Sequence, residues 1–123
     1  AVKASGYEIV RAFDAISVMT KARECVPDVV LLDINLPGGD GFLVADRLRS
    51  LDVTAGIPVI FITASKQAGL REKAMSLGAR NFLEKPFGAK DLIFAIEEAL
   101  CTERVFESVQ LGYVATRMSG ILI

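Results

Sequence analysis

The chain has 123 residues, a formal net charge of -1 and a hydrophobic fraction of 52%. This length fits one domain with a single core, and the near-neutral charge argues against a nucleic-acid-binding surface. The sequence contains no histidine, which excludes histidine acid/base catalysis, Ser-His triads and histidine-ligated metals. Cys25 and Cys101 match no metal or CxxC spacing and are interpreted as buried thiols in a reducing compartment. Because no apolar run reaches membrane length and no signal-peptide pattern is present, we expect a soluble cytoplasmic domain.

Short apolar runs alternate with segments of helical periodicity. Residues 1–6 are interpreted as the end of an earlier helix. Asp14 is expected to cap the first full helix, whose apolar positions Ile16, Met19 and Ala22 recur at helical spacing. Strands are predicted over 7–12, 29–33, 58–63 and 81–84, and helices over 15–24, 42–51, 67–77 and 89–100. This alternation predicts an α/β domain with a parallel sheet and right-handed crossovers.

Three polar residues stand at the ends of successive predicted strands. Asp33 follows the apolar run 29–32 and precedes a loop that contains Pro37 and several glycines. Thr63 and Lys85 end the next two strands, at intervals of 30 and 22 residues that each contain one helix. Since the carboxyl ends of parallel strands lie at one edge of the sheet, we expect these three side chains to converge there.

The three residue types suit phosphoryl transfer. A carboxylate can attack a phosphoryl group and hold it as an acyl phosphate, while a hydroxyl and an ammonium group bind the phosphoryl oxygens. Mg²⁺ commonly assists such chemistry through oxygen ligands. Asn35, two residues after Asp33, can offer its backbone carbonyl to such an ion.

Taken together, these motifs resemble a response-regulator receiver domain of two-component signalling, over about Tyr7 to Cys101. The resemblance rests on the motifs Leu-Leu-Asp-Ile-Asn-Leu-Pro-Gly-Gly-Asp-Gly (31–41), Ile-Thr-Ala (62–64) and Phe-Leu-Glu-Lys-Pro-Phe (82–87) in this order. It implies a bacterial, three-layer α/β/α, flavodoxin-like module rather than an enzyme. It implies as partners a sensor histidine kinase or phosphotransfer protein and an output domain or effector, without direct nucleic-acid or membrane binding; a homodimer stays open.

The resemblance also implies residue roles. Asp33 would be the phosphoacceptor, and Thr63 and Lys85 would contact the phosphoryl group. Mg²⁺ would be bound by Asp33 and the backbone carbonyl of Asn35. Thr63 and Phe82 would act as switch residues: they would change conformation on phosphorylation and so alter the surface made by the third helix, the last strand and the fourth helix. The Lys85–Pro86 peptide bond would be cis.

The sequence departs from this family at its start. Family members open with an apolar strand, then a pair of adjacent acidic residues that supplies most Mg²⁺ carboxylates, and then a full first helix. The strand, the acidic pair and most of that helix have no counterpart before Tyr7. The missing strand would lie between strands 7–12 and 29–33. We therefore divide the chain into a receiver domain over 1–101 and a tail over 102–123. The tail, or a second chain, would fill the vacant sheet position; a linker helix is the alternative interpretation.

Three functions remain open from the sequence. The first is a phosphoacceptor signalling module. The second, favoured by the absent acidic pair, is an interaction module that works without phosphorylation, or an inactive fragment. The third is a phosphohydrolase with an aspartate nucleophile, which Asn35 disfavours because such enzymes place a second aspartate there as general acid.

Overall fold

A computed structural model of the chain describes residues 2–4, 7–36, 38–111 and 118–122, with side-chain surroundings given for 9–36 and 38–100. The strands are β1 (Val2–Ala4), β2 (Tyr7–Arg11), β3 (Val29–Asp33), β4 (Asn35–Leu36), β5 (Gly39–Asp40), β6 (Val59–Thr63), β7 (Asn81–Glu84) and β8 (Met118–Leu122). The helices are α1 (Ala15–Cys25), α2 (Gly41–Ser50), α3 (Leu70–Ser76) and α4 (Ala89–Leu111).

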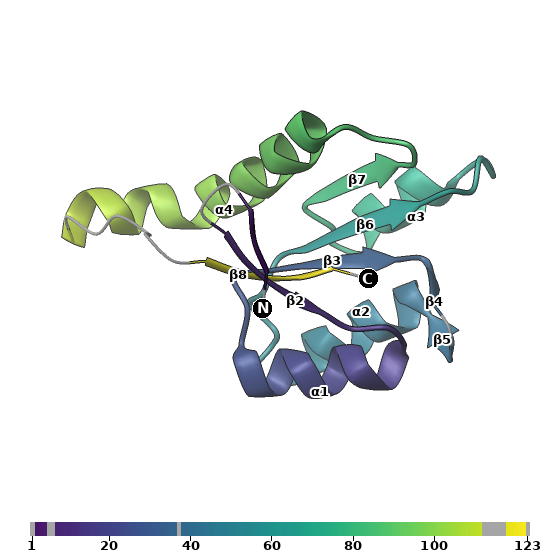
Figure 1. Cartoon of the computed structure of the whole chain (residues 1–123), viewed down its shortest axis with the longest axis horizontal. Coiled ribbons are helices and arrows are strands. Elements are labelled where there is room, and N and C mark those ends of the chain that lie inside the picture. The colour runs from purple at the N-terminus through teal and green to yellow at the C-terminus, as the bar shows by residue number, and fades with distance from the viewer. Residues whose placement is uncertain (1, 5–6, 37, 112–117, 123) are drawn as a thin grey trace.

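The main sheet has the strand order β1-β2-β8-β3-β6-β7 (Figure 1). β2, β8, β3, β6 and β7 run parallel to one another, whereas β1 pairs antiparallel with β2 at the edge. β4 and β5 form a separate two-stranded ribbon in the loop after Asp33. The predicted parallel α/β sheet is therefore present.

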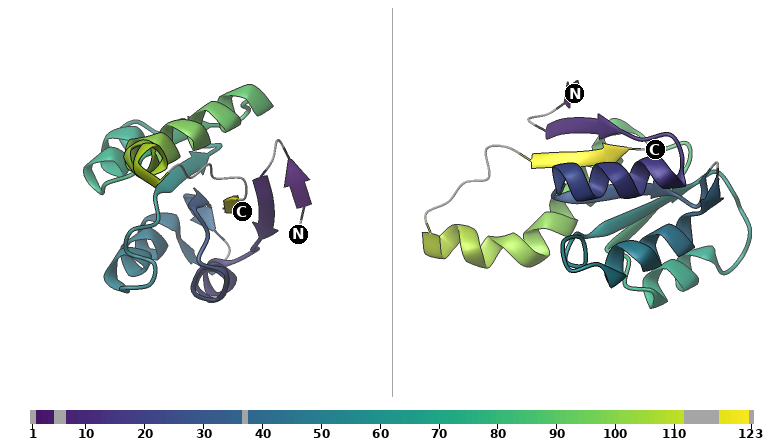
Figure 2. Two further views of the ribbon diagram at one scale, coloured as in Figure 1. Left: turned by 90° about the vertical axis from the view of Figure 1, so that its left-hand side faces the viewer. Right: turned by 90° about the horizontal axis from the view of Figure 1, so that it is seen from below.

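The helices cover the sheet on two sides (Figure 2). α1, α2 and α3 share one hydrophobic cluster with alternate residues of the strands, including Val30 and Leu32 of β3. α4 covers the opposite face, where Ala95, Ile96, Ala99 and Leu100 pack with Val29, Leu31 and Ile60. Because β3 is buried on both faces, it reads as the continuous apolar run seen in the sequence.

The strand β8 occupies the position between β2 and β3. Its five residues are in register with Tyr7 to Arg11 of β2, and Gly120 and Ile121 are in register with Val29 and Val30 of β3. A strand from the far end of the chain thus stands inside the sheet, and β8 is the strand that joins the β1–β2 hairpin to the rest.

Several local predictions are wrong. Residues 2–4 form β1 rather than a helix end, because the outer edge of β2 offers backbone groups that a hairpin satisfies. Ile16 is 77% exposed, and α1 instead buries Ala15, Val18 and Ala22. Cys25 is exposed rather than buried, and Cys101 lies outside the residues with described side chains.

Two helix ends also differ from the prediction. α3 begins at Leu70 rather than near 67, because Gly69 precedes it with φ of 87°, a left-handed conformation that an α-helix does not continue through. α4 continues to Leu111 instead of ending at Leu100. In the described part of the chain, no helix is long and apolar enough to cross a membrane.

Candidate functional site

The three polar residues predicted at strand ends lie at one edge of the sheet. β6 lies between β3 and β7. Asp33 is in register with Ile62, and Thr63 is in register with Glu84, which Lys85 follows. The sheet order therefore places Asp33, Thr63 and Lys85 on three adjacent strand ends.

Asp33 and Lys85 are in direct contact. Lys85 donates from Nζ to Asp33 Oδ2 at 2.9 Å. The side chain of Asp33 is 17% exposed and that of Lys85 is 42% exposed, so the pair lies at the surface but the carboxylate is largely shielded. An ammonium group at this distance can neutralise charge that develops on groups bound to the carboxylate.

The second carboxylate oxygen of Asp33 is held by the loop that follows. Asp33 Oδ1 accepts a hydrogen bond from the backbone N–H of Asn35 at 2.9 Å. Gly41 donates from its backbone N–H to Ile34 O at 2.8 Å, and a Cβ at Gly41 would collide with the backbone of Asp33 and Ile34. Asp40 accepts a hydrogen bond from Phe42 N and caps α2. The glycine at 41 therefore allows the loop to fold tightly beneath Asp33.

Thr63 is completely buried, with 0% exposure. Its Oγ1 accepts a hydrogen bond from the backbone N–H of Ser65 at 3.0 Å. The hydroxyl is thus engaged with the β6–α3 segment in this structure. Lys85 joins the same strand through its backbone, since Lys85 N donates to Thr63 O at 2.7 Å.

Phe82 is buried in the core, with 3% exposure, in register with Phe61 of β6. The Phe61 ring in turn packs against Phe42 of α2, with centroids 4.9 Å apart. Arg71 of α3 places its guanidinium carbon 5.0 Å from the centroid of the Phe82 ring. The side chain of Phe82 therefore lies between the core and a cation on α3.

No sequence motif assigns a role in the site to Lys66 or Arg71. Both are exposed, yet Lys66 Nζ lies 3.2 Å from Glu84 Oε2 and donates to Lys85 O at 3.4 Å. Lys66 thereby ties the β6–α3 segment to the end of β7, next to Lys85. No spacing in the sequence signals this contact, because it depends on β6 and β7 being neighbours.

The Lys85–Pro86 bond is cis, as the family resemblance implied.

The described residues do not form a carboxylate-rich metal site. No group of three or more His, Cys, Asp or Glu side chains able to hold a metal ion is present among them. Asp33 contributes one carboxylate, and its Oδ2 is already paired with Lys85. Because Mg²⁺ prefers several oxygen ligands in octahedral geometry, these residues alone do not fit a complete Mg²⁺ site.

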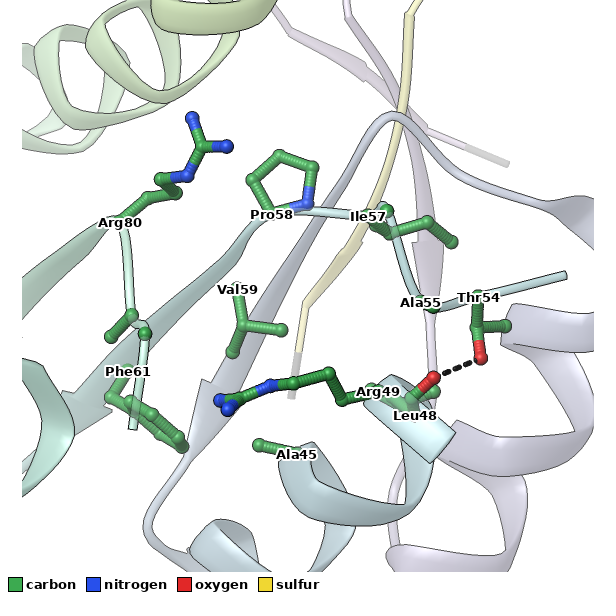
Figure 3. Close-up of a pocket in the computed structure, with 13 residues that line it drawn as sticks. Ala45, Leu48, Arg49, Thr54, Ala55, Ile57, Pro58, Val59, Phe61 and Arg80 are labelled. Atoms are coloured by element: carbon green, nitrogen blue, oxygen red, sulfur yellow. Dashed lines mark hydrogen bonds between the residues drawn. The ribbon is translucent and has the colours of Figure 1, made fainter. Parts of the chain in front are cut away.

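Two cavities lie at opposite ends of the sheet. A groove of about 840 Å³ lies beside the site, between the loops after β3 and β6, and Asn35, Asp40, Ser65, Gln67 and Lys73 are among its lining residues. A cavity of about 270 Å³ lies at the amino end of β6, where Arg49 and Arg80 flank Val59 (Figure 3). There Thr54 donates from its hydroxyl to Leu48 O. The second cavity is thus remote from Asp33.

The sequence matches a family model described as the response regulator receiver domain over residues 1–97. It is 35% identical over 96 residues to the DNA-binding dual master transcriptional regulator RpaA of Synechocystis, covering 78% of this chain and 40% of that protein. It is 36% identical over 116 residues to the transcriptional regulatory protein PdtaR of Mycobacterium tuberculosis, covering 94% of this chain and 55% of that protein. The chain thus spans less than two thirds of the length of these relatives.

Solved structures with the same fold include the receiver domain of the sensor histidine kinase PA1611 from Pseudomonas aeruginosa, which has a magnesium ion coordinated in its active-site cleft. The TM-score is 0.69 at 27% identity, and the match covers 77% of this chain and 78% of that one. These matches confirm the expected flavodoxin-like receiver fold. Together with the ordered strand-end residues and the match over 1–97, they show that the chain belongs to the response regulator receiver domain family of two-component systems.

Proposed function

We propose that this chain is a phosphoacceptor module that takes a phosphoryl group onto Asp33 from a histidine kinase or a phosphotransfer protein. The observation that carries the proposal is the shielded Asp33 carboxylate with Lys85 Nζ at 2.9 Å. The proposal rests on this contact, on the neighbouring strand ends and on membership of the family.

The proposed reaction is an exchange of one bond to phosphorus. An Asp33 carboxylate oxygen attacks the phosphorus, a new P–O bond forms, and the bond from phosphorus to the donor breaks with its electron pair leaving on the donor. Lys85 stabilises the negative charge of the transferred group electrostatically. Thr63, whose hydroxyl now accepts from Ser65 N, is the proposed second contact to the phosphoryl oxygens.

We also propose that Asp33 and the backbone carbonyl of Asn35 are the contributions of the described residues to any Mg²⁺ site. Bound Mg²⁺ would supply charge neutralisation at the phosphoryl oxygens. The described residues lack the further carboxylates that such a site needs. Phosphoryl transfer to this chain is therefore expected to rely on Lys85 more than it does in a receiver with a complete acidic set.

The proposed output is a change at the face of α3, β7 and α4. Thr63 turning toward a phosphoryl group would release Ser65 N and alter the β6–α3 segment. That segment carries Lys66, which contacts Glu84 and Lys85. Phe82 and the α3 residue Arg71 lie beside it, so the change would reach the surface that an output domain or effector contacts.

The experiment is intact-mass analysis after incubation with acetyl phosphate, with and without Mg²⁺. A single phosphoryl adduct on the chain, absent from an Asp33→Asn variant, is the expected result. The control variant is Asp28→Asn, which changes an aspartate near the opposite end of β3. Absence of an adduct on protein that circular dichroism shows to be folded would contradict the proposal.

A second candidate function is an interaction module that binds its partner without phosphorylation. The observation that favours it is the absence of a metal-binding carboxylate cluster among the described residues. A binding assay with the isolated partner, on the chain and on Asp33→Asn after the same acetyl phosphate treatment, separates the two functions. Equal partner binding by the two proteins would identify the interaction module.

A further inference from the structure

The cavity at the amino end of β6 lies at the end of the sheet opposite to Asp33. It has a volume of about 270 Å³ and is bordered by the end of α2, the α2–β6 loop and the α3–β7 turn. Its floor is apolar, because it is lined by residues of the core cluster or packed against that cluster: Ala45, Leu48, Val59 and Phe61. An apolar cavity of about 150 Å³ is enough to bind one benzene molecule. This cavity therefore has room for a single ring with one polar substituent.

Small residues keep the walls of this cavity open. Ala55 and Gly56 of the α2–β6 loop and Gly78 and Ala79 of the α3–β7 turn line it. Gly78 has φ of 89°, which favours glycine, and a Cβ there would lie 3.3 Å from Nη2 of Arg49. The Arg49 guanidinium thus lies against the α3–β7 turn, where a larger residue at position 78 would displace it.

The charged groups that line the cavity are cationic. Among the described residues that line it, the charged ones are Arg49 and Arg80, and Figure 3 shows them on either side of Val59. Arg80 is half-buried and donates from Nη1 to Ala99 O at 3.3 Å, which holds its side chain in place. Arg49 makes no hydrogen bond or ion pair with the described residues, and its side chain extends across the cavity toward Phe61 (Figure 3). The N–H donors of Arg49 can therefore bind an anion without breaking another contact.

The carbonyl groups at the end of α2 are paired within the chain. Helix carboxyl ends carry partial negative charge, which repels an anion. Leu48 O accepts a hydrogen bond from the Thr54 hydroxyl. Leu51 O accepts from the backbone N–H groups of Thr54 and Ala55 at 3.1 and 2.8 Å. These hydrogen bonds reduce the negative potential at the cavity, and Arg49 adds a positive charge in the last turn of the same helix.

We propose that this cavity binds a small carboxylate that carries one apolar ring, with the ring on the apolar floor and the carboxylate on the guanidinium of Arg49. A guanidinium and a carboxylate can form two parallel N–H···O hydrogen bonds. An inorganic anion leaves the floor uncovered, and a neutral ring leaves the Arg49 charge without a counter-charge. The ligand therefore needs both parts. The site is separate from Asp33, and the proposal does not depend on the phosphoacceptor function.

The test is a titration of the full, nitrogen-15-labelled chain with benzoate, followed by two-dimensional NMR. The backbone amide signals of Gly56, Gly78 and Ala79 report on the cavity, because these residues line it. We expect their chemical shifts to change and to saturate with benzoate concentration. Benzamide is a neutral molecule of the same shape, and inorganic phosphate is an anion without a ring. Both are expected to bind about tenfold more weakly than benzoate or less tightly still.

Two variants locate the carboxylate. Arg49→Gln should weaken benzoate binding by about tenfold, because it removes a charged hydrogen-bond donor. The matched control is Arg47→Gln, at an exposed arginine of the same helix that does not line the cavity, and it should bind benzoate as the unchanged chain does. Unchanged benzoate binding by Arg49→Gln would overturn the proposal. So would a lack of saturable shifts in the unchanged chain, or equal affinity of that chain for benzoate and either comparison compound.

Discussion

Lys85 Nζ lies 2.9 Å from Asp33 Oδ2, although 52 residues separate the two along the chain. Their strands are not neighbours, because β6 lies between β3 and β7. Lys85 therefore reaches past the end of β6 to the carboxylate. The contact exists only when all three strands are assembled in this order, so it reports on the integrity of the whole edge.

Replacing Lys85 should impair phosphorylation without unfolding the domain. We expect Lys85→Met to slow acetyl phosphate labelling of Asp33 by about 100-fold, the usual effect of removing one preorganised charge-stabilising donor. The pair is partly exposed, so the free energy of unfolding should change by less than about 1 kcal/mol. Intact-mass time courses and urea unfolding measure the two effects. Lys90→Met, at an exposed lysine of α4, is the control, and equal labelling rates for both variants would contradict the assigned role.

The buried hydroxyl of Thr63 should protect the Ser65 amide. Thr63→Val keeps the side-chain volume but leaves Ser65 N without its acceptor, so we expect a loss of about 1–3 kcal/mol in the free energy of unfolding. Amide hydrogen exchange at Ser65 should become faster. Thr63→Ser retains the acceptor and should retain the slow exchange. Unchanged protection in Thr63→Val would refute this explanation.

Asp14 should contribute a pH-dependent part of the stability. At the start of α1, hydrogen bonds from the Ser17 side chain and from the Ser17 backbone N–H, which donates to Asp14 Oδ1, lower the pKa of the Asp14 carboxyl group below its ordinary value of 3.8. Because the folded pKa lies below the unfolded value, the contribution is present above about pH 4 and is lost as the pH falls through the folded pKa. Urea unfolding midpoints between pH 5 and pH 3 test this. Asp14→Asn keeps a capping oxygen without the charge and should show a smaller decrease over the same interval; an equal decrease would count against Asp14.

The contact between Arg71 and Phe82 should carry measurable coupling energy. The guanidinium lies 5.0 Å from the ring centroid, and a cation–π contact at a partly exposed site contributes about 0.5–1 kcal/mol. A double-mutant cycle with Arg71→Gln and Phe82→Leu, followed by urea unfolding, should give this value. The control cycle pairs Phe82→Leu with Glu72→Gln, a change at the exposed residue next to Arg71 in the sequence. We expect no coupling energy in this control cycle. Equal values in the two cycles would show that the contact is not specific.

Carboxylates added after β8 should create a Mg²⁺ site. Val30 is in register with Ile121, and β3 continues for three residues to Asp33. Two aspartates joined after Ile123 would therefore come level with Asp33, where the family's acidic pair stands. Calorimetric titration of Mg²⁺ should show binding to this extended chain and none to the chain itself or to a version extended by two asparagines. Equal Mg²⁺ binding by all three chains would refute the placement.

The sequence predicted most of the parallel sheet and the positions of Asp33, Thr63 and Lys85 correctly. The apolar run 29–32 and the breakers after it are local signals that hold in any context. The helical spacing of apolar residues could not predict that Ala15 is buried in place of Ile16. Consecutive residues are separated by only about one third of a turn around the helix axis, so either one could face the core. The contact of Lys66 with Glu84 was also missed, since it requires two strands to be placed first.

The sequence by itself determined the alternation of strands and helices, the polar strand ends and the family, because periodicity, turn residues and motif spacing are properties of short segments. Only the tertiary structure decided that Val2–Ala4 forms an edge strand and that Met118–Leu122 stands between β2 and β3. Both placements depend on backbone hydrogen-bonding groups left open by strands elsewhere in the chain. Backbone N–H and C=O groups are present on almost every residue, so the side-chain pattern does not show which segment will pair with an open strand edge. That pairing is determined only when the sheet is assembled.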